Sequence, residues 1–328
     1  MAKAPAVERA STPGKGWRTL LRRPSNLWDR LFQGVTLLAA LSLVLLLAAM
    51  SAYLFNAARP AIAQYGLRFL TGSTWDPVRE VFGAVPAIFG TLVTSATAMV
   101  VAVPVSLGVA IFLAELAPKW LRAPASFLVE MLAAIPSVVL GMWGIFVMVP
   151  TLYPVEKWLA ENASFIPIFR GPVFGGFGFL AGGLILAIMS LPIITAVARD
   201  AILTVPNTQR EAMLALGATR WETISKAVLP SARSGIVAAG ILGLGRALGE
   251  TMAVTMLIGN GFKVTERLFA PGNTMASKIA TQFNEASGLE VNALVELALV
   301  LFAISLAVNL IGRLLIRLTV GRVPWGGR

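Results

Sequence analysis

Six apolar segments, each long enough to cross a membrane, dominate the pattern of this chain. A bilayer core about 30 Å thick needs roughly 20 apolar residues per helix. Six runs reach that length: residues 31–55, 84–114, 124–149, 173–198, 234–262 and 291–312. The second run is too long for one untilted helix, so we expect residues 84–89 to turn along the membrane surface and Pro104 to bend the remainder. The pattern predicts an all-α, polytopic membrane protein with six transmembrane helices and both termini on one side.

A polar, helix-forming segment at residues 208–230 separates the fourth run from the fifth. It contains two capping boxes, in which a hydroxyl precedes a carboxylate by three residues: Thr208 with Glu211, and Thr219 with Glu222. Two short helices are therefore predicted between two membrane spans. A compact helix-turn-helix on one membrane face has the shape to dock a partner.

The same segment contains the residues expected to end these helices. Gly217 should close the first helix, because glycine adopts the left-handed closing conformation at little cost. Pro230 should stop the second helix.

Composition agrees with a membrane protein. Of the 328 residues, 57% are hydrophobic and 13% are charged, and the mean hydropathy is +0.78, which excludes a water-soluble globule for most of the chain. The alternative for the first run is a secretory signal peptide, because basic residues precede it and small residues such as Ala49 and Ser51 follow. Its apolar length exceeds the roughly 7 to 15 residues of a signal core, which favours a retained anchor.

The distribution of Lys and Arg predicts the orientation, because these residues are retained on the cytoplasmic side. Eighteen lie in the two terminal segments and in the second and fourth connections, and eight lie in the other connections. Both termini and the 208–230 segment are therefore predicted to be cytoplasmic. This orientation explains the net charge of +11 without nucleic acid. The basic N-terminal tail is expected to touch anionic lipid.

The chain contains no Cys and no His. It therefore has no disulfide, thiolate nucleophile, imidazole base or usual zinc ligand, and no catalytic or metal site is predicted. No Gly-rich run ends in Gly-Lys-Ser/Thr to bind nucleotide phosphates. If ATP is used, another chain binds it.

One charged pair, Arg246 and Glu250, lies within the fifth apolar run. Charge at membrane depth is by default a functional hypothesis, and a four-residue spacing places two side chains on one face of a helix, where they can pair. Arg246 could offer its planar, permanently charged fork to an oxyanion crossing the pore, with Glu250 preventing that anion from binding too tightly. From the residues alone, an ion pair that only fixes helix packing is equally consistent.

The apolar runs also contain glycines and acidic residues that are candidates for helix packing or for function. Glycines let helix backbones approach closely in lipid, and four of them surround the charged pair: Gly240, Gly243, Gly245 and Gly249. Glu130 and Glu296 also lie in or near apolar runs but have no obvious partner in the sequence. For both residues, burial against another polar group is favoured over a role in binding the substrate.

The 208–230 segment resembles the permease signature of bacterial ABC importers. That signature is Glu-Ala-Ala, three residues, Gly, nine residues, Ile, one residue and Leu-Pro. The matching residues are Glu211, Ala212, Gly217, Leu229 and Pro230, whereas Met213 and Ala227 depart from it at apolar positions. In that family the loop forms coupling helices that sit in a groove of the ATPase subunit. The resemblance thus implies an ATPase-docking loop, which here also contains Arg220 and Trp221.

Residues 86–118, 132–144 and 242–260 are similar to the PstC-type permeases of phosphate-specific importers, and the likeness covers most of residues 84–312. In that family the arginine and glutamate that match Arg246 and Glu250 are implicated in phosphate passage. The resemblance therefore favours the substrate pathway for this pair over mere helix packing.

The resemblance implies a type I ABC importer permease for inorganic phosphate in the bacterial inner membrane. Residues 1–30 would be a cytoplasmic basic tail, residues 31–320 the six-span permease domain with a coupling loop at 199–233, and residues 321–328 a cytoplasmic end. The expected partners are a second, PstA-like permease, a PstB-like ATPase dimer that uses ATP and Mg, and an extracytoplasmic PstS-like phosphate-binding protein. The alternatives are an ABC permease for another solute, such as molybdate, sulfate or an amino acid, and a secondary transporter or channel without ATP. A membrane enzyme is weaker still.

Overall fold

The computed structural model describes residues 27–320, with side chains described to residue 317. The predicted tail up to residue 26 and the C-terminal end 321–328 lie outside the described residues. The chain divides into two compact units, one ending at Tyr53 and the other beginning at Leu54. In the described part of the first unit, residues 27–50 of helix α1 are exposed throughout. An apolar helix with this exposure suits a lipid environment.

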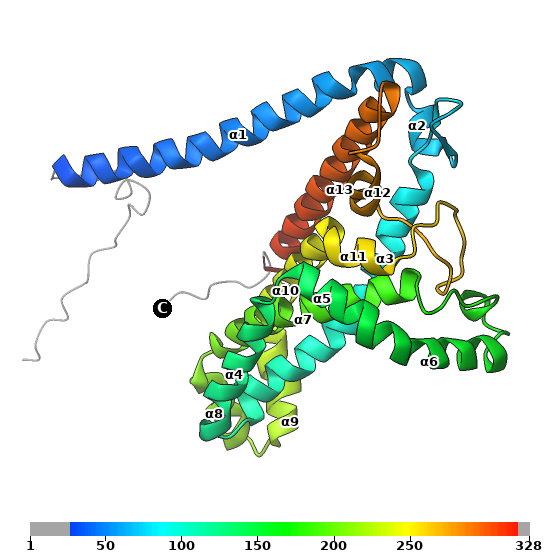
Figure 1. Ribbon diagram of the computed structural model, residues 1–328. Coiled ribbons are helices and arrows are strands. Elements are labelled where there is room, and N and C mark those ends of the chain that lie inside the picture. The colour runs from blue at the N-terminus through cyan, green and yellow to red at the C-terminus, as the bar shows by residue number, and fades with distance from the viewer. Residues whose placement is uncertain (1–26, 321–328) are drawn as a thin grey trace, which may run out of the picture. The chain divides into compact units, whose positions relative to one another are not determined.

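The described chain is helical apart from its connections, of which that between α11 and α12 is long, and one pair of two-residue strands (Figure 1). The α-helices are α1 (Leu27–Tyr65), α2 (Arg68–Thr71), α3 (Val85–Ile111), α4 (Lys119–Ala133), α5 (Ser137–Trp143), α6 (Val149–Asn162), α7 (Phe179–Leu203), α8 (Asn207–Ala215), α9 (Arg220–Thr223), α10 (Leu229–Gly249), α11 (Met252–Leu257), α12 (Met275–Gln282) and α13 (Leu289–Val320). Wider π-helical turns lie at η2 (Phe112–Leu116), η3 (Gly144–Met148) and η5 (Ile224–Val228), and a 3₁₀ turn η4 at Pro167–Phe169. Strands β1 (Trp75–Asp76) and β2 (Val81–Phe82) pair antiparallel.

Six continuous helices in the described chain are long and apolar enough to cross a membrane, which confirms the predicted number of spans. They comprise Leu27–Tyr65, Val85–Leu116, Ser137–Asn162, Phe179–Leu203, Arg220–Gly249 and Leu289–Arg317. The protein is therefore a multi-pass membrane protein with an all-helical fold.

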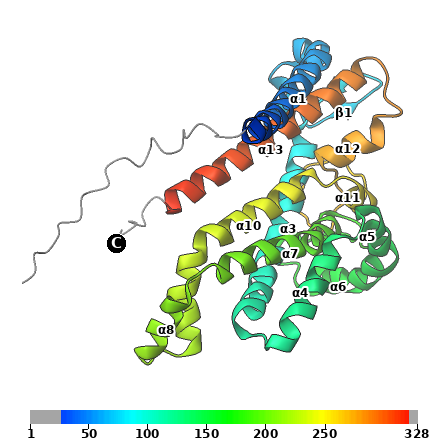
Figure 2. The ribbon, with the colours of Figure 1, turned by 90° about the vertical axis from the view of Figure 1, so that its left-hand side faces the viewer.

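The core of the second unit is the packing of α3 against α7, with α10 beside both (Figures 1 and 2). The buried residues at this contact are mostly alanine, as at Ala98 and Ala198. Glycine brings the backbones closer still, because a Cβ added to Gly183 would lie 2.6 Å from the Cβ of Thr97. Small residues allow helices to pack where lipid supplies no hydrophobic drive between them.

Three predicted boundaries differ in the structure, two of them at prolines. Residues 84–89 do not form a surface turn, because Pro86 lies in the first turn of α3, where its missing N–H costs nothing. The third run is interrupted between α4 and α5, where Pro136 is extended at φ −59° and ψ 140° and disfavours helix in the residue before it. The fifth span begins at Arg220 and ends at Gly249, rather than covering residues 234–262.

The connection between α11 and α13 holds a buried cation. Lys278 of α12 is buried, with its Nζ 5.1 Å from the ring centroid of Trp75 and 4.5 Å from that of Phe262. Trp75 donates from Nε1 to Glu290 Oε1 at 3.2 Å. Two aromatic rings thus face the ammonium group, but burial has the larger effect and lowers the pKa of Lys278 to about 8.

Candidate functional site

The first helix of the 208–230 loop begins earlier than predicted. Helix α8 starts at Asn207, directly after Pro206, which is extended at ψ 138°, and no side chain caps it. Thr208 therefore lies inside the first turn, and the predicted capping box with Glu211 is wrong. The physical reason is that the nonhelical Pro206 already defines the boundary.

Gly217 closes α8 as predicted. Its φ is +81°, its N–H donates to Leu214 O at 3.0 Å, and the N–H of Ala218 donates to Met213 O at 3.1 Å. This pair of bonds is the Schellman closure that a left-handed glycine permits. A Cβ added at Gly217 would meet nothing within 4 Å, so the backbone conformation, not a lack of space, favours glycine here.

The second capping box is confirmed. Thr219 Oγ1 accepts from the N–H of Glu222 at 3.2 Å, and Glu222 Oε2 accepts from the N–H of Thr219 at 3.0 Å. Lys226 Nζ also donates to Glu222 Oε1 at 3.1 Å. The start of α9 is therefore held by its own side chains.

Pro230 does not end the second helix. The N–H of Leu229 donates to Ile224 O across five residues, and this wider π turn precedes Pro230, which lies in the first turn of α10. A proline is tolerated there because its missing N–H is not needed. As a result the loop continues without a break into a membrane helix, Arg220–Gly249.

The loop presents a mixed polar and apolar surface. Six of the predicted docking residues are exposed and Leu229 is half-buried: the exposed ones are Glu211, Ala212, Gly217, Arg220, Trp221 and Pro230. Leu214 and Leu216 are also exposed, although neither was among the predicted docking residues. Their signal was present in the sequence, because exposed apolar residues in a polar loop indicate an interaction surface.

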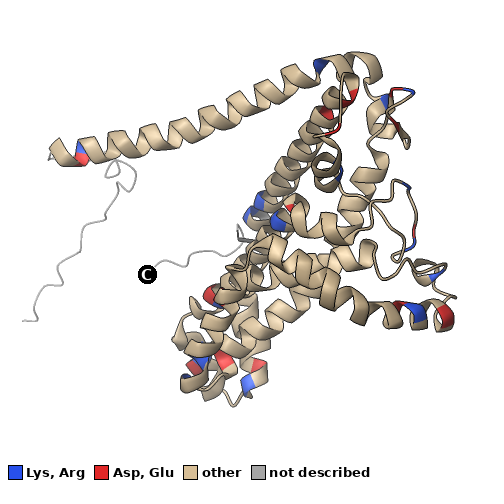
Figure 3. Cartoon of the chain, viewed as in Figure 1, with Lys and Arg blue, Asp and Glu red and all other residues tan. Residues whose placement is uncertain are grey.

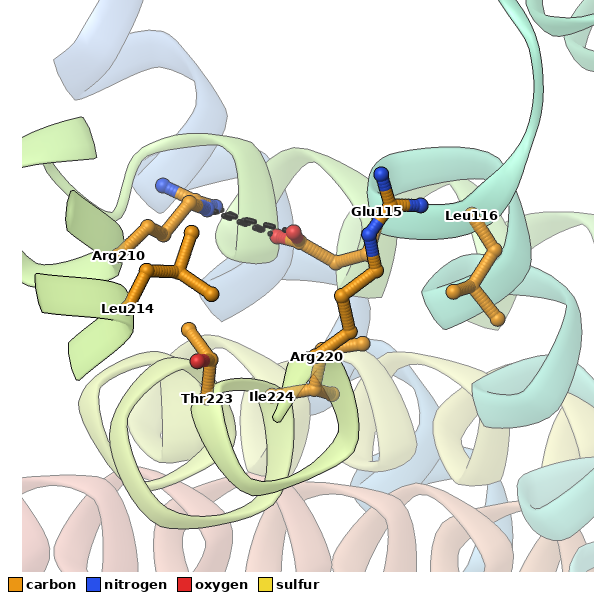
Figure 4. Close-up of a pocket in the computed structure, with 7 residues that line it drawn as sticks. All are labelled: Glu115, Leu116, Arg210, Leu214, Arg220, Thr223 and Ile224. Atoms are coloured by element: carbon orange, nitrogen blue, oxygen red, sulfur yellow. Dashed lines mark hydrogen bonds and ion pairs between the residues drawn. The ribbon is translucent and has the colours of Figure 1, made fainter. Parts of the chain in front are cut away.

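An ion pair under the loop was also missed. Arg210 of α8 donates from Nε and Nη2 to the carboxylate of Glu115 in η2, with Nη2 2.6 Å and Nε 3.1 Å from Oε1 (Figure 4). The side chains are 17% and 12% exposed, respectively. They line a cavity of about 120 Å³ together with Leu116, Leu214, Arg220, Thr223 and Ile224. Residues 95 positions apart in the chain are thus joined at the base of the loop.

Arg246 and Glu250 are not on one helical face. Helix α10 ends at Gly249, and Glu250 is extended at ψ 128°. Across the described residues no ion pair joins the two side chains within 4.0 Å. Arg246 is half-buried, and its Nε is buried with no hydrogen-bond partner in the part of the chain that is described. The predicted helical pairing is therefore wrong, whereas a role in the substrate pathway stays a prediction.

The four glycines of α10 differ in their surroundings. A Cβ on Gly243 would lie 2.5 Å from Ile194 Cδ1 of α7, and one on Gly245 would lie 3.9 Å from Asn309 Oδ1. At Gly240 and Gly249 it would meet nothing within 4 Å. Close packing within this chain therefore applies to Gly243, and a packing role for Gly240 and Gly249 stays a prediction.

Charged side chains of the second unit gather around α8 and α9 and in the loops of the opposite end (Figure 3). Glu130 pairs with Arg199 at 3.3 Å but is 54% exposed. Glu296 is buried, and its Oε2 has no partner among the described residues. Within residues 27–320 no group of three or more Asp, Glu, His or Cys side chains could hold a metal ion.

These features define the membrane-embedded permease subunit of a transporter. The model of the family described as "Binding-protein-dependent transport system inner membrane component" matches residues 106–323. "Phosphate transport system permease protein PstC" of Pasteurella multocida is 47% identical over 293 residues, covering 88% of this chain and 91% of that protein. The protein of the same name from Mesorhizobium japonicum is 42% identical over 314 residues, covering 94% and 96%. The chain belongs to the binding-protein-dependent transport system inner membrane component family, and over most of its length it is similar to the PstC proteins.

Solved structures agree on the fold. A chain of the inward-facing MetNI methionine ABC transporter has a TM-score of 0.54 and 18% identity, covering 75% of this chain and 99% of that chain. A chain of a bacterial alginate ABC transporter has a TM-score of 0.57 and 18% identity, covering 87% and 95%. At this identity the likeness establishes the fold alone, and it confirms the predicted type I ABC importer permease architecture.

Proposed function

We propose that this chain is the permease subunit of an ATP-driven importer that carries inorganic phosphate across the bacterial inner membrane. The observation that carries the proposal is the structure of the 208–230 loop. Gly217 closes α8, Thr219 caps the start of α9, and the loop presents exposed apolar side chains and continues into a membrane helix. The similarity to proteins named PstC supports phosphate as the substrate.

The chain works with partners in this proposal and has no catalytic site of its own. A PstB-like ATPase dimer binds ATP and Mg and docks on the 208–230 loop. A second, PstA-like permease completes the pore, and a PstS-like protein delivers phosphate from outside the cell. The excess of Lys and Arg in the terminal segments and in this loop supports a cytoplasmic position for both termini and for the loop.

ATP-driven closure of the ATPases would displace the 208–230 loop as a rigid body. The helix Arg220–Gly249 includes both the second half of that loop and Arg246, so displacement at one end would reorient the other. Arg246 would offer its guanidinium to the passing anion, because a planar fork suits phosphate oxygens. The carboxylate of Glu250 would weaken that binding by repulsion, so that the anion is released.

Uptake of radiolabelled phosphate by proteoliposomes that hold the four kinds of chain tests this function. The native complex should show ATP-dependent uptake of labelled phosphate. Unlabelled phosphate should inhibit this uptake more strongly than molybdate or sulfate does. Arg246→Gln should abolish uptake while the complex still assembles. Arg79→Gln is the matched control, because the side chain of Arg79 is 83% exposed and lies away from the helix that ends at Gly249. Better competition by another solute would refute phosphate as the substrate, and undiminished uptake by Arg246→Gln would leave Arg246 a structural charge.

A further inference from the structure

The Glu115–Arg210 ion pair joins the 208–230 loop to a membrane helix that is far from it in the sequence. Glu115 lies in η2, the π turn that extends α3 to Leu116. In this turn the N–H of Ala117 donates to Phe112 O at 2.7 Å. π turns inside helices frequently mark functional positions, and this one carries the carboxylate that Arg210 binds.

Arg210 also contacts the end of a second membrane helix. Its Nη2 donates to Ile202 O at 3.0 Å, and its Nη1 donates to Val205 O. Ile202 lies in the last turn of α7. One guanidinium group in α8 thus binds the ends of both α3 and α7.

The two helices held by Arg210 form one packed body. The backbones of α3 and α7 approach at Gly183 and Thr97, and Ser106 Oγ donates to Leu191 O across the same contact at 3.2 Å. A force applied to their shared end would move both helices together, because close-packed interiors transmit strain.

The loop is attached to the membrane helices in two different ways. On one side it continues directly into α10 through η5. On the other side the short connection 204–206 links the loop to the end of α7. The loop has no such short link to α3, because about 90 residues separate them in the chain. Movement of the loop would therefore reach α10 by continuity but would reach α3 only through contacts.

We propose that Arg210 and Glu115 are positioning residues that transmit displacement of the 208–230 loop to α3 and α7. The inference rests on the proposed function, because it assumes that an ATPase moves this loop. The contact suits the role, since a charge-assisted bond with two donors fixes both distance and orientation. It is also shielded from water, so salt screens it little.

The expected signature of losing this contact is uncoupling: ATP hydrolysis continues, but fewer phosphate ions cross for each ATP consumed. The measurement is the number of phosphate ions imported per ATP hydrolysed in proteoliposomes that hold the complete complex. Glu115→Gln removes the charge at nearly constant volume and should lower this number at least tenfold. The matched control is Glu130→Gln, which breaks the more exposed Glu130–Arg199 pair and should change it less than twofold.

A second variant keeps the proposal testable if Glu115→Gln does not assemble. The native chain has no cysteine, so Glu115→Cys with Arg210→Cys introduces a unique pair of thiols into it. This double variant should be uncoupled, and a bifunctional thiol reagent that spans the two positions should restore the phosphate-to-ATP number. A merely local structural role of the ion pair would not produce this rescue.

Two outcomes would overturn the inference: a native phosphate-to-ATP number in Glu115→Gln, or a cross-linked double variant that stays uncoupled. These results differ from a failure of the proposed function itself. In that case the native complex would import no phosphate, or the ATPase would not associate with the chain at all.

Discussion

Gly217 offers the sharpest test of the 208–230 loop, because the structure separates the effect of backbone conformation from the effect of side-chain size. Its φ is +81°, and a Cβ added there would meet no atom within 4 Å. A left-handed conformation costs an ordinary L-residue roughly 1–2 kcal/mol, while Asn adopts it more readily. A substitution at Gly217 should therefore be penalised for its backbone preference and not for its volume.

The variants Gly217→Asn, Gly217→Ala and Gly217→Val separate these two explanations, because the order of Asn and Ala reverses between them while Val is the most damaging under both. We expect Asn to be the mildest, Ala to cost roughly 1–2 kcal/mol, and the β-branched Val to cost more. A cost of about 1.4 kcal/mol corresponds to a tenfold change in an equilibrium constant. Part of that cost should appear as weaker binding of the ATPase to the loop.

The assay is the dissociation constant between the ATPase dimer and the assembled permeases in detergent, together with the thermal midpoint of the purified chain. Ser225→Ala serves as a control, because it lies in the same loop without a left-handed backbone. Damage that follows side-chain volume, with Asn worse than Ala, would refute the reasoning. Native binding by all three variants would also refute it.

The remaining predictions concern the cap of α9, the buried Lys278 and the contact between α7 and α10. Thr219→Ala should lower the thermal stability of the loop by about 1 kcal/mol, whereas Thr208→Ala, which removes no cap, should have little effect; equal melting curves for the two would contradict this. Burial lowers the pKa of Lys278 to about 8, against an opposing effect of the Glu290 charge. The folded state then holds this proton less tightly than the unfolded state, so stability should rise between about pH 8 and the ordinary lysine pKa of about 10.4. Lys278→Met should remove that rise in thermal melts recorded across this range. Gly243→Ala should destabilise the purified chain by about 1–3 kcal/mol through overpacking against Ile194. Gly240→Ala, which meets nothing within 4 Å, should not destabilise the chain in the same melts, because Ala is favoured over Gly inside a helix.

Local chemistry explains which features of the 208–230 loop could be predicted. The closing glycine and the second capping box depend on residues within five positions of each other, so their sequence pattern was sufficient. The first capping box failed because Pro206, just outside the pattern, is the last nonhelical residue, so α8 begins at Asn207, two residues earlier than a cap at Thr208 would place it. Pro230 failed as a stop because η5 widens the helix before it. In both cases a neighbouring backbone conformation decided the outcome.

The hydropathy pattern by itself determined the number of membrane helices and the polar loop between the fourth and fifth of them, and the composition, with no Cys and no His, excluded chemistry that needs those side chains. These properties follow from composition and from short stretches of sequence, because each membrane helix needs only its own apolar run and satisfies its backbone hydrogen bonds internally. The family signature in the loop could also be recognised in the sequence, because all its residues lie between Glu211 and Pro230.

Only the tertiary structure decided which distant residues meet. Arg210 and Glu115 are 95 positions apart, and their contact depends on how α3 and α7 pack. The separation of Arg246 from Glu250 depends on where α10 ends, and the difference between Gly243 and Gly240 depends on which face of α10 meets α7. Helix packing of this kind arises from the shapes of many small side chains at once, so no single local pattern in the sequence encodes it.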